Sequence, residues 1–441
     1  MTTSVSPSTL RNNNSRRQQG AGRPRNPEVE RRALEAARSI YGESGKSYVT
    51  FSNVAARASI GKAALYRRWA SPVDLLMDAL RSIPLPGAIA DLGDVQTELA
   101  QFCRALMELY VSPDGAALMR LTTEFHDETE PFRQWITDVS RSMIAHAETA
   151  LDRAIQRGES VPNMSAEAVT QVLTGTVLSH TVYRLHADQP IPRHELGQFC
   201  WNLAGLALGR VETTRKPEHQ RFLAETHATE TVVAGGRKAN LIRIAQQVAA
   251  SRGFAELTLA DIAKSAGLTT PALYTHFASR AELIEQVLEV TAREYVEDLA
   301  QTDEPSGSVE VRLRTRLHRW AAMPTPRLRL LNDAVLHIHD SVRVKSAIQR
   351  ARGAWDAFVR DVLAKGVDRG EVRRDVDLDV AVELLTSCLF GVEVASDTGL
   401  AESTLLDLSD RLVDMFLAYV GGGGWTVSGI DERPPSELPC T

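Results

Sequence analysis

A chain of 441 residues with 43% hydrophobic and 24% charged residues has the composition of a globular protein with room for roughly two to four domains. No apolar run approaches the roughly 18 residues of a membrane-spanning helix, and the polar, asparagine-rich start does not resemble a signal peptide. The four cysteines, Cys103, Cys200, Cys388 and Cys440, fit neither a disulfide framework nor a zinc-binding spacing, so we expect reduced thiols in a cytoplasmic protein.

The net charge of −6 is distributed unevenly along the chain. Residues 1–75 contain 13 basic and 5 acidic side chains and carry +8, whereas residues 236–283 contain 6 and 3 and carry +3. The remainder therefore carries −17. Because each neutralised phosphate releases local counterions, the position of positive charge matters more than its total. Two basic segments in an acidic background favour contact with nucleic acid through those segments.

Residues 1–27 form a basic arm that we expect to be disordered. Its arginines are Arg11, Arg16, Arg17, Arg23 and Arg25. Residues 22–25, Gly-Arg-Pro-Arg, resemble the core of an AT-hook that can lie in a narrow minor groove, although a flexible tail on the phosphates is the simpler alternative.

Residues 28–84 predict three helices and a tight turn. The apolar stripe of the first helix consists of Ala33, Ala36, Ala37, Ile40 and Tyr41. Gly45 ends this helix, Thr50 can cap a second helix of about two turns, and a third runs from Gly61 to Trp69. Two short helices joined by a tight turn form a helix-turn-helix, whose last helix can enter the major groove.

Residues 85–211 have helical apolar spacing interrupted by prolines. We expect helices near 92–110, 114–125, 130–157, 165–186 and 194–210. The polar stretch 212–235 is the expected linker to the second half of the chain.

Residues 236–293 repeat the first head. Residues 45–75 align without a gap on residues 253–283 and are identical at ten of 31 positions. The preceding stripe is Leu241, Ile244, Ala245, Val248 and Ala249. A weaker match joins residues 154–174 to 366–386 at an offset of 212. The chain therefore consists of two copies of one unit of about 200 residues.

Residues 294–420 repeat the helical body, with helices expected near 308–322, 327–338, 343–366, 376–396 and 401–420. Residues 421–441 begin with four glycines and form the expected disordered tail.

The two heads, TFSNVAARASIGKAALYRRWASPVDLL and TLADIAKSAGLTTPALYTHFASRAELI, resemble the DNA-binding head of TetR/AcrR-family repressors. The resemblance implies an all-α fold of two tandem units, each with a three-helix head and an effector-binding and dimerisation domain. It implies DNA contacts from Thr50, Gly61, Lys62, Tyr66, Arg67 and Arg68 in the first head, and from Thr258, Thr269, Thr270, Tyr274, Thr275 and His276 in the second. Thr50 and Thr258 are expected on phosphates, and Arg237 and Lys238 form the short basic arm of the second head.

The first head departs from this pattern at three positions. Ser59 replaces the turn glycine Gly267, and a serine in the left-handed conformation costs on the order of 1 kcal/mol. Gly61 replaces the expected cap Thr269, and Pro72 replaces Arg280, from which we expect a phosphate contact.

The resemblance also implies that the last two helices of each unit pack as a four-helix bundle. Both partners lie in one chain, so we expect an intramolecular pseudo-dimer; a homodimer of whole chains is the alternative. Small residues that would allow close helix approach are Ala204, Gly205, Ala207 and Gly209, and Thr386, Ser387, Cys388 and Gly391.

Aromatic and histidine side chains of the bodies are candidates for an effector pocket, with core packing as the alternative. They are Trp135, Tyr183, His186, Trp320, His337 and Trp355. The spacing of His337 and His339, like the triplet 126–128, does not favour a metal site. We expect no metal or cofactor, and the chain lacks the motifs and the catalytic set of an enzyme.

The sequence therefore predicts a transcriptional repressor that binds an asymmetric operator through two unlike heads and responds to an unknown, small apolar effector. One alternative is a regulator in which only the second head reads DNA. The other is a ligand- or partner-binding protein that has lost operator recognition.

Overall fold

The computed structural model describes residues 27–124, 130–159, 161, 165–186, 193–209, 236–300, 307–321, 330–331, 334–335, 341–397 and 405–421. Within these ranges the secondary structure is helical apart from one isolated β-bridge, between Val372 and Gly421. The arm with Arg11, Arg16, Arg17, Arg23 and Arg25, the linker 212–235 and nearly all of the tail lie outside the described residues.

The first head consists of α1 (Pro27–Ser44), the short 3-10 helix η1 (Lys46–Tyr48), α2 (Phe51–Ala58) and α3 (Lys62–Tyr66). The predicted stripe of α1 is buried throughout. Gly45 adopts φ 86°, where glycine has no Cβ penalty, and the Thr50 hydroxyl accepts the Asn53 amide at 3.1 Å. The predicted helix end and cap are both confirmed.

The second head repeats this arrangement with α10 (Arg237–Glu256), α11 (Leu259–Ser265) and α12 (Thr270–Tyr274). Gly253 adopts φ 77° and kinks α10, and Thr258 caps α11 by accepting the Asp261 amide at 3.1 Å. In the predicted stripe, Ile244 and Val248 are only half-buried, while Ile242 and Gln246 are buried.

The prediction that the third helix reaches Trp69 or Phe277 is wrong. The helix ends at Tyr66 and at Tyr274, because the next amides turn back onto one carbonyl. The amides of Arg68 and Trp69 both donate to Leu65 O, at 2.8 and 3.0 Å. In the second head the amides of His276 and Phe277 both donate to Leu273 O, at 2.9 and 3.0 Å.

Ser59 adopts the left-handed conformation that its position requires, with φ 52°, where the second head has Gly267 at φ 66°. A Cβ built on Gly267 meets no atom within 4 Å, so the penalty at this position is conformational rather than a steric clash. We expect Ser59→Gly to stabilise the first head by about 1 kcal/mol and Gly267→Ser to destabilise the second by a similar amount. Thermal unfolding of both variants measures this, and destabilisation by Ser59→Gly would contradict it.

Helix α4 (Pro72–Arg81) packs on α1 and completes the first head, and the first body consists of α5 (Val95–Tyr110), α6 (Gly115–Glu124), α7 (Glu130–Gln156), α8 (Ala166–His186) and α9 (Arg193–Ala207). Helix α13 (Arg280–Ala300) runs from the second head into its body, which continues with α14 (Val309–Ala321), α16 (Val342–Arg369), α17 (Leu378–Asp397) and α18 (Leu405–Val420). Helix ends agree with the predictions to within four residues, except that the helix expected near 327–338 falls mostly outside the described residues. No described helix combines the length and apolarity of a membrane span.

One repeated contact confirms the weak match between the bodies. The amide of Val95 at the start of α5 donates to Glu159 Oε2 at 3.1 Å, and that of Val309 at the start of α14 donates to Glu371 Oε2 at 2.6 Å. Both glutamates belong to the shared Arg-Gly-Glu segment, and each also pairs with an arginine two residues earlier. The same structural unit is built twice.

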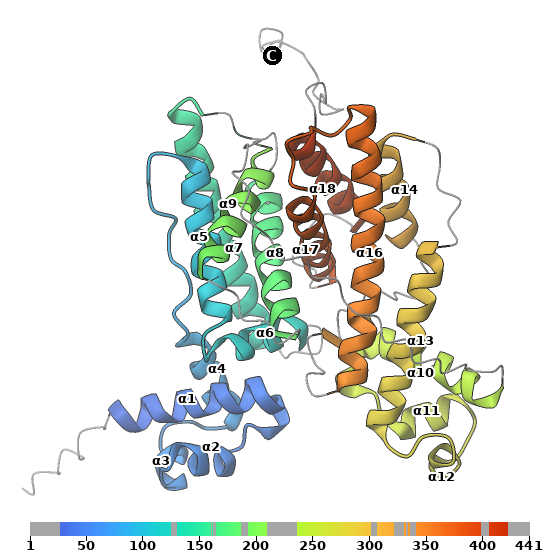
Figure 1. Cartoon of the computed structure of the whole chain (residues 1–441). Helices are drawn as coiled ribbons and strands as arrows, with labels where there is room; N and C mark the ends of the chain where they lie inside the picture. The colour runs from blue at the N-terminus through green and yellow to red at the C-terminus, as the bar shows by residue number, and fades with distance from the viewer. Residues whose placement is uncertain are drawn as a thin grey trace, which may run out of the picture.

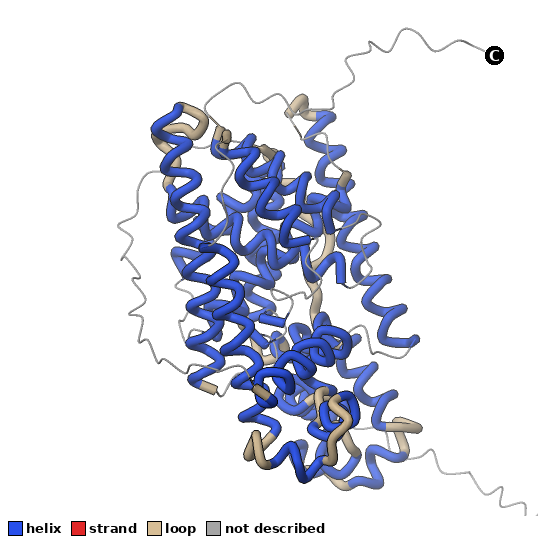
Figure 2. Tube along the Cα trace, turned by 90° about the vertical axis from the view of Figure 1, so that its right-hand side faces the viewer, coloured by secondary structure: helices blue, strands red, loops and turns tan. Residues whose placement is uncertain are grey.

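The two bodies meet through α8 and α17, with α9 beside α18, as expected of a four-helix bundle (Figure 1). Gly391 lies at the closest approach of α17 to α8, as predicted. Its partner on α8 is Gly175, which was not predicted; a Cβ on Gly175 would fall 2.3 Å from Gly391 Cα. Thr386 instead donates to Asp356 Oδ1 of α16 at 2.8 Å, within its own unit. Both heads lie at the same end of this assembly (Figures 1 and 2).

Three cysteines, Cys103, Cys200 and Cys388, are free and buried. Burial raises the pKa of Cys200 and of Cys388 to about 12 and shifts that of Cys103 in the same direction. Since the thiolate is the reactive form, we expect native Cys440→Ser protein at pH 8 to release less than about a tenth of the thionitrobenzoate that it releases after unfolding in guanidinium. Full reaction without denaturant would contradict this.

Candidate nucleic-acid interface

In the first head, two buried anchors hold the predicted reading surface. Leu65 is fully buried, and the indole N–H of the buried Trp69 donates to Asp78 Oδ2 at 2.9 Å. Around them Gly61, Lys62, Tyr66 and Arg67 are exposed. Arg68 is half-buried, and its guanidinium donates to Ala64 O at 3.2 Å, a carbonyl in the last turn of α3.

In the second head, Leu273 and Phe277 are the corresponding anchors. Thr269, Tyr274 and Thr275 are exposed, whereas Thr270 and His276 are half-buried. The surface therefore offers hydroxyl and methyl groups where the first head offers cations. Such groups suit thymine methyls and phosphates, whereas lysine and arginine suit guanine or phosphate.

The prediction that the Thr269 side chain caps the recognition helix is wrong. Thr269 stands at the N-cap position but makes no side-chain capping bond. The caps of α2 and α11 accept the amide three residues further along, but here that amide, of Ala272, donates to Thr269 O at 3.0 Å. The exposed hydroxyl thus stays clear of its own helix.

An exposed tyrosine ends each recognition helix, with Tyr66 65% and Tyr274 55% exposed. The ring of Phe51 in α2 packs edge-on against Tyr66, with centroids 4.6 Å apart. Leu259 occupies the Phe51 position in the second head. The first tyrosine is thus held by an aromatic contact that the second head lacks.

The two threonines predicted on phosphates have different surroundings. The Thr258 hydroxyl donates to Asp261 Oδ2, which places a carboxylate beside it. The first head has Asn53 at that position, and the side-chain amide of Asn53 donates to Tyr48 O at 2.9 Å. The start of α2 therefore carries one negative charge fewer than the start of α11 and is the better candidate for a phosphate.

Three further basic residues predicted at DNA belong to the second head. Arg280 donates to the carbonyl oxygens of Leu257, at 2.5 Å, and of Phe254, so it stabilises the end of α10 rather than presenting a free guanidinium. Arg237 and Lys238 belong to the first turn of α10 and do not form a separate arm. The Lys238 ammonium lies 5.3 Å from the centroid of the Phe277 ring.

Of the three candidate effector side chains that the structure describes, one lies apart from the other two. Trp135 packs against the core of the first head, whereas Tyr183 and the buried Trp355 belong to the larger core of the bodies. The indole N–H of Trp355 has no hydrogen-bond partner among the described residues. His337 and the side chains of His186 and Trp320 lie outside the described part of the chain.

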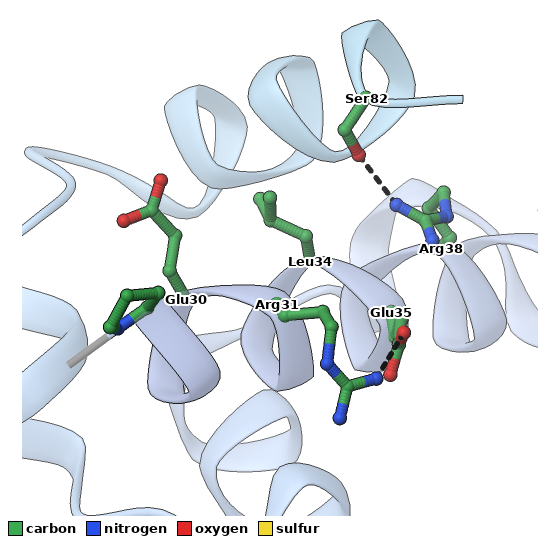
Figure 3. A pocket seen from close by; sticks show the side chains of 7 residues that line it. Glu30, Arg31, Leu34, Glu35, Arg38 and Ser82 are labelled. Atoms are coloured by element: carbon green, nitrogen blue, oxygen red, sulfur yellow. Dashed lines mark hydrogen bonds and ion pairs between the residues drawn. The ribbon is translucent and has the colours of Figure 1, made fainter. Parts of the chain in front are cut away.

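A groove of about 370 Å³ lies between α1 and the end of α4 (Figure 3). Four of its seven lining side chains, Glu30, Arg31, Glu35 and Arg38, are charged; Arg38 Nη1 donates to Ser82 Oγ at 2.6 Å, and Arg31 pairs with Glu35 at 2.6 Å. This lining does not suit an apolar effector. Within the ranges that the structure describes, no group of three histidine, cysteine or acidic side chains has the arrangement of a metal site.

Comparison with known proteins assigns the class. The model of bacterial regulatory proteins of the tetR family matches residues 241–287, and that of the tetracyclin repressor-like C-terminal domain matches residues 89–196 and again 303–414. The transcriptional regulator AqdR of Rhodococcus erythropolis is 32% identical over 171 residues, covering 36% of this chain and 76% of AqdR. The transcriptional repressor KstR2 of Rhodococcus jostii is 27% identical over 162 residues, covering 36% of this chain and 78% of KstR2.

A solved structure of Bacillus subtilis FadR with stearoyl-CoA is 15% identical, with a TM-score of 0.33, and the match covers 41% of this chain and 98% of FadR. The matches to AqdR and KstR2 each span less than half of the chain. The C-terminal model matches twice, once in each half. The chain belongs to the TetR family of helix-turn-helix transcriptional regulators, with the family unit repeated in tandem.

Proposed function

We propose that one chain is a complete operator-binding unit, an effector-responsive repressor whose two heads bind two unlike half-sites. The observation that carries this proposal is the pair of recognition helices at one end of the molecule, one with Lys62 and Arg67 exposed and the other with Thr269 and Thr275 (Figure 1). A symmetric dimer presents identical readers about 34 Å apart, and its operator mirrors that symmetry. Two heads that differ in sequence do not require a symmetric operator.

The domains of this proposal are the heads 28–84 and 236–293 and the bodies 85–211 and 294–420. The arm 1–27, the linker 212–235 and the tail 421–441 complete the chain. The two bodies form an intramolecular pseudo-dimer through α8, α9, α17 and α18. A small apolar effector in one or both bodies changes the spacing of the heads, and repression in the cytoplasm ends because both helices no longer engage together.

Systematic selection of bound sequences from random duplex DNA tests the operator directly. We expect two conserved blocks of different sequence, centred about one helical turn or a multiple apart. A perfect palindrome would contradict the proposal. A single conserved block would show that only one head reads DNA.

A further inference from the structure

The contact between α8 and α17 is centred on two residues at equivalent positions of the repeat. The Thr176 hydroxyl donates to Cys388 Sγ at 3.0 Å, and these residues are 212 apart, the offset that relates the two bodies. The backbones of Gly175 and Gly391 touch beside them. At the same offset, Gly175 corresponds to Ser387 and Gly391 to Ser179, and both serines are fully buried. The crossing therefore resembles the two-fold axis of a symmetric dimer.

The polar contacts around this crossing are not symmetric. His180 Nδ1 of α8 lies 3.0 Å from Glu383 Oε1 of α17, with His180 only 3% exposed. The ring of Phe199 stacks on His180 at 3.8 Å. The Arg352 guanidinium of α16 lies over the ring of Tyr183 at 4.3 Å. All these contacts join one unit to the other, except the stacking of Phe199, which orients His180 within its own unit.

The positions related to these by the 212-residue offset are uncharged. Glu383 corresponds to Gln171 and His180 to Val392, while Arg352 corresponds to Ser140 and Tyr183 to Ala395. These charged contacts thus have no counterpart on the other side of the crossing. In a pairing of two first bodies, His180 would be opposite Gln171. In a pairing of two second bodies, Glu383 would be opposite Val392 and Arg352 opposite Ala395.

The surroundings of Glu383 favour its charged form. Burial opposes it, but the hydrogen bond and charge of His180, followed by the charges of Arg352 and Arg184, lower the pKa of Glu383 to about 2. Asp356 also faces Arg352, at 3.7 Å from Nε. His180 is buried, whereas the Glu383 side chain is 37% exposed. A second carboxylate in place of His180 would therefore be buried beside Glu383, which is destabilising because neither charge is compensated.

We propose that His180, Tyr183, Arg352 and Glu383 form a pairing surface that accepts the unlike body and rejects a second copy of the same body. A polar contact inside an otherwise apolar helix interface is a known means of fixing which helices associate. The surface fits one partner, the other half of the same chain. This inference rests on the proposed function in one respect: it explains how two unlike heads stay together in each molecule.

Charge reversal in the full-length chain, without DNA, tests the pairing surface. His180→Glu brings two carboxylates together, and Glu383→Lys brings an ammonium to His180 and Arg352. Each single variant is expected to lower the thermal midpoint by about 5–10 °C, and the double variant to recover at least half of that loss. Gln171→Lys, at the position equivalent to Glu383, is the matched control, with an expected change below about 2 °C.

Mixing the two single variants adds a test in trans. The glutamate introduced at position 180 of one chain then matches the lysine introduced at position 383 of the other, and the two unchanged bodies match as in the native protein. Light scattering should find a species of twice the chain mass in the mixture and not in either variant alone. The proposal is overturned if the double variant is no more stable than the weaker single variant and the mixture keeps the single-chain mass. That failure would leave the operator selection unaffected.

Discussion

Alanine at both Lys62 and Arg67 is expected to weaken binding of the selected operator by at least about 30-fold. Both side chains are exposed on or directly after the recognition helix of the first head. A base contact contributes about 1–3 kcal/mol, so two lost base contacts amount to at least about 2 kcal/mol, or about 30-fold in affinity. A lost phosphate contact would in addition lower the salt slope by about one. Fluorescence anisotropy titrations at several salt concentrations measure both quantities.

The matched control removes two positive charges from the first body, with Arg104→Ala in α5 and Arg141→Ala in α7. Both arginines are exposed, and each is paired with an acidic residue of its own helix. We expect less than about a twofold change in affinity, because neither arginine belongs to a head and each charge is offset by its acidic neighbour. If the Lys62 and Arg67 variant lost less than about threefold, the second head alone would account for operator reading.

Grafting the second reading surface onto the first head is expected to change the operator from asymmetric to palindromic. The variant carries Gly61→Thr, Lys62→Thr, Arg67→Thr and Arg68→His, which gives both heads the same residues at the positions predicted on the recognition elements. Tyr66 already matches Tyr274. Since sequence is read by base contacts, each half-site should follow the residues of the head that binds it.

Competition between the native operator and a palindrome of the second half-site measures the graft. We expect the ratio of the two affinities to shift by at least about tenfold toward the palindrome. The reciprocal graft, with the residues of the first head placed on the second, should favour a palindrome of the first half-site. An unchanged preference in both variants would mean that other residues determine the operator.

Much of each head was predictable because local backbone chemistry fixes it. Gly45 and Gly253 end helices, Thr50 and Thr258 cap them, and Ser59 takes a left-handed turn, all within a few residues of chain. The failures have different causes. The amide of Ala272, three residues after Thr269, donates to the Thr269 carbonyl oxygen rather than to its side chain, and Arg280 reaches carbonyls that lie 23 and 26 residues earlier in the sequence.

The pairing surface was not predictable in the same way. His180 and Glu383 lie on separate helices, and their meeting depends on where α8 and α17 cross. Apolar spacing indicates that each helix is buried but not which residue faces which. Gly175 illustrates this limit, since a glycine inside a helix indicates close approach only when its partner Gly391 is known. The 212-residue offset relates equivalent positions of α8 and α17, but it identifies which residues face each other only once the contact between Thr176 and Cys388 is known.

The mass of the complex between the protein and the selected operator shows whether one chain occupies both half-sites. Light scattering on a single duplex, with protein in slight excess, counts the chains that occupy one site. We expect the mass of one chain plus one duplex, with both unlike half-sites protected from nuclease. A complex of two chains on one site, with each half-site bound by the same head, would contradict it.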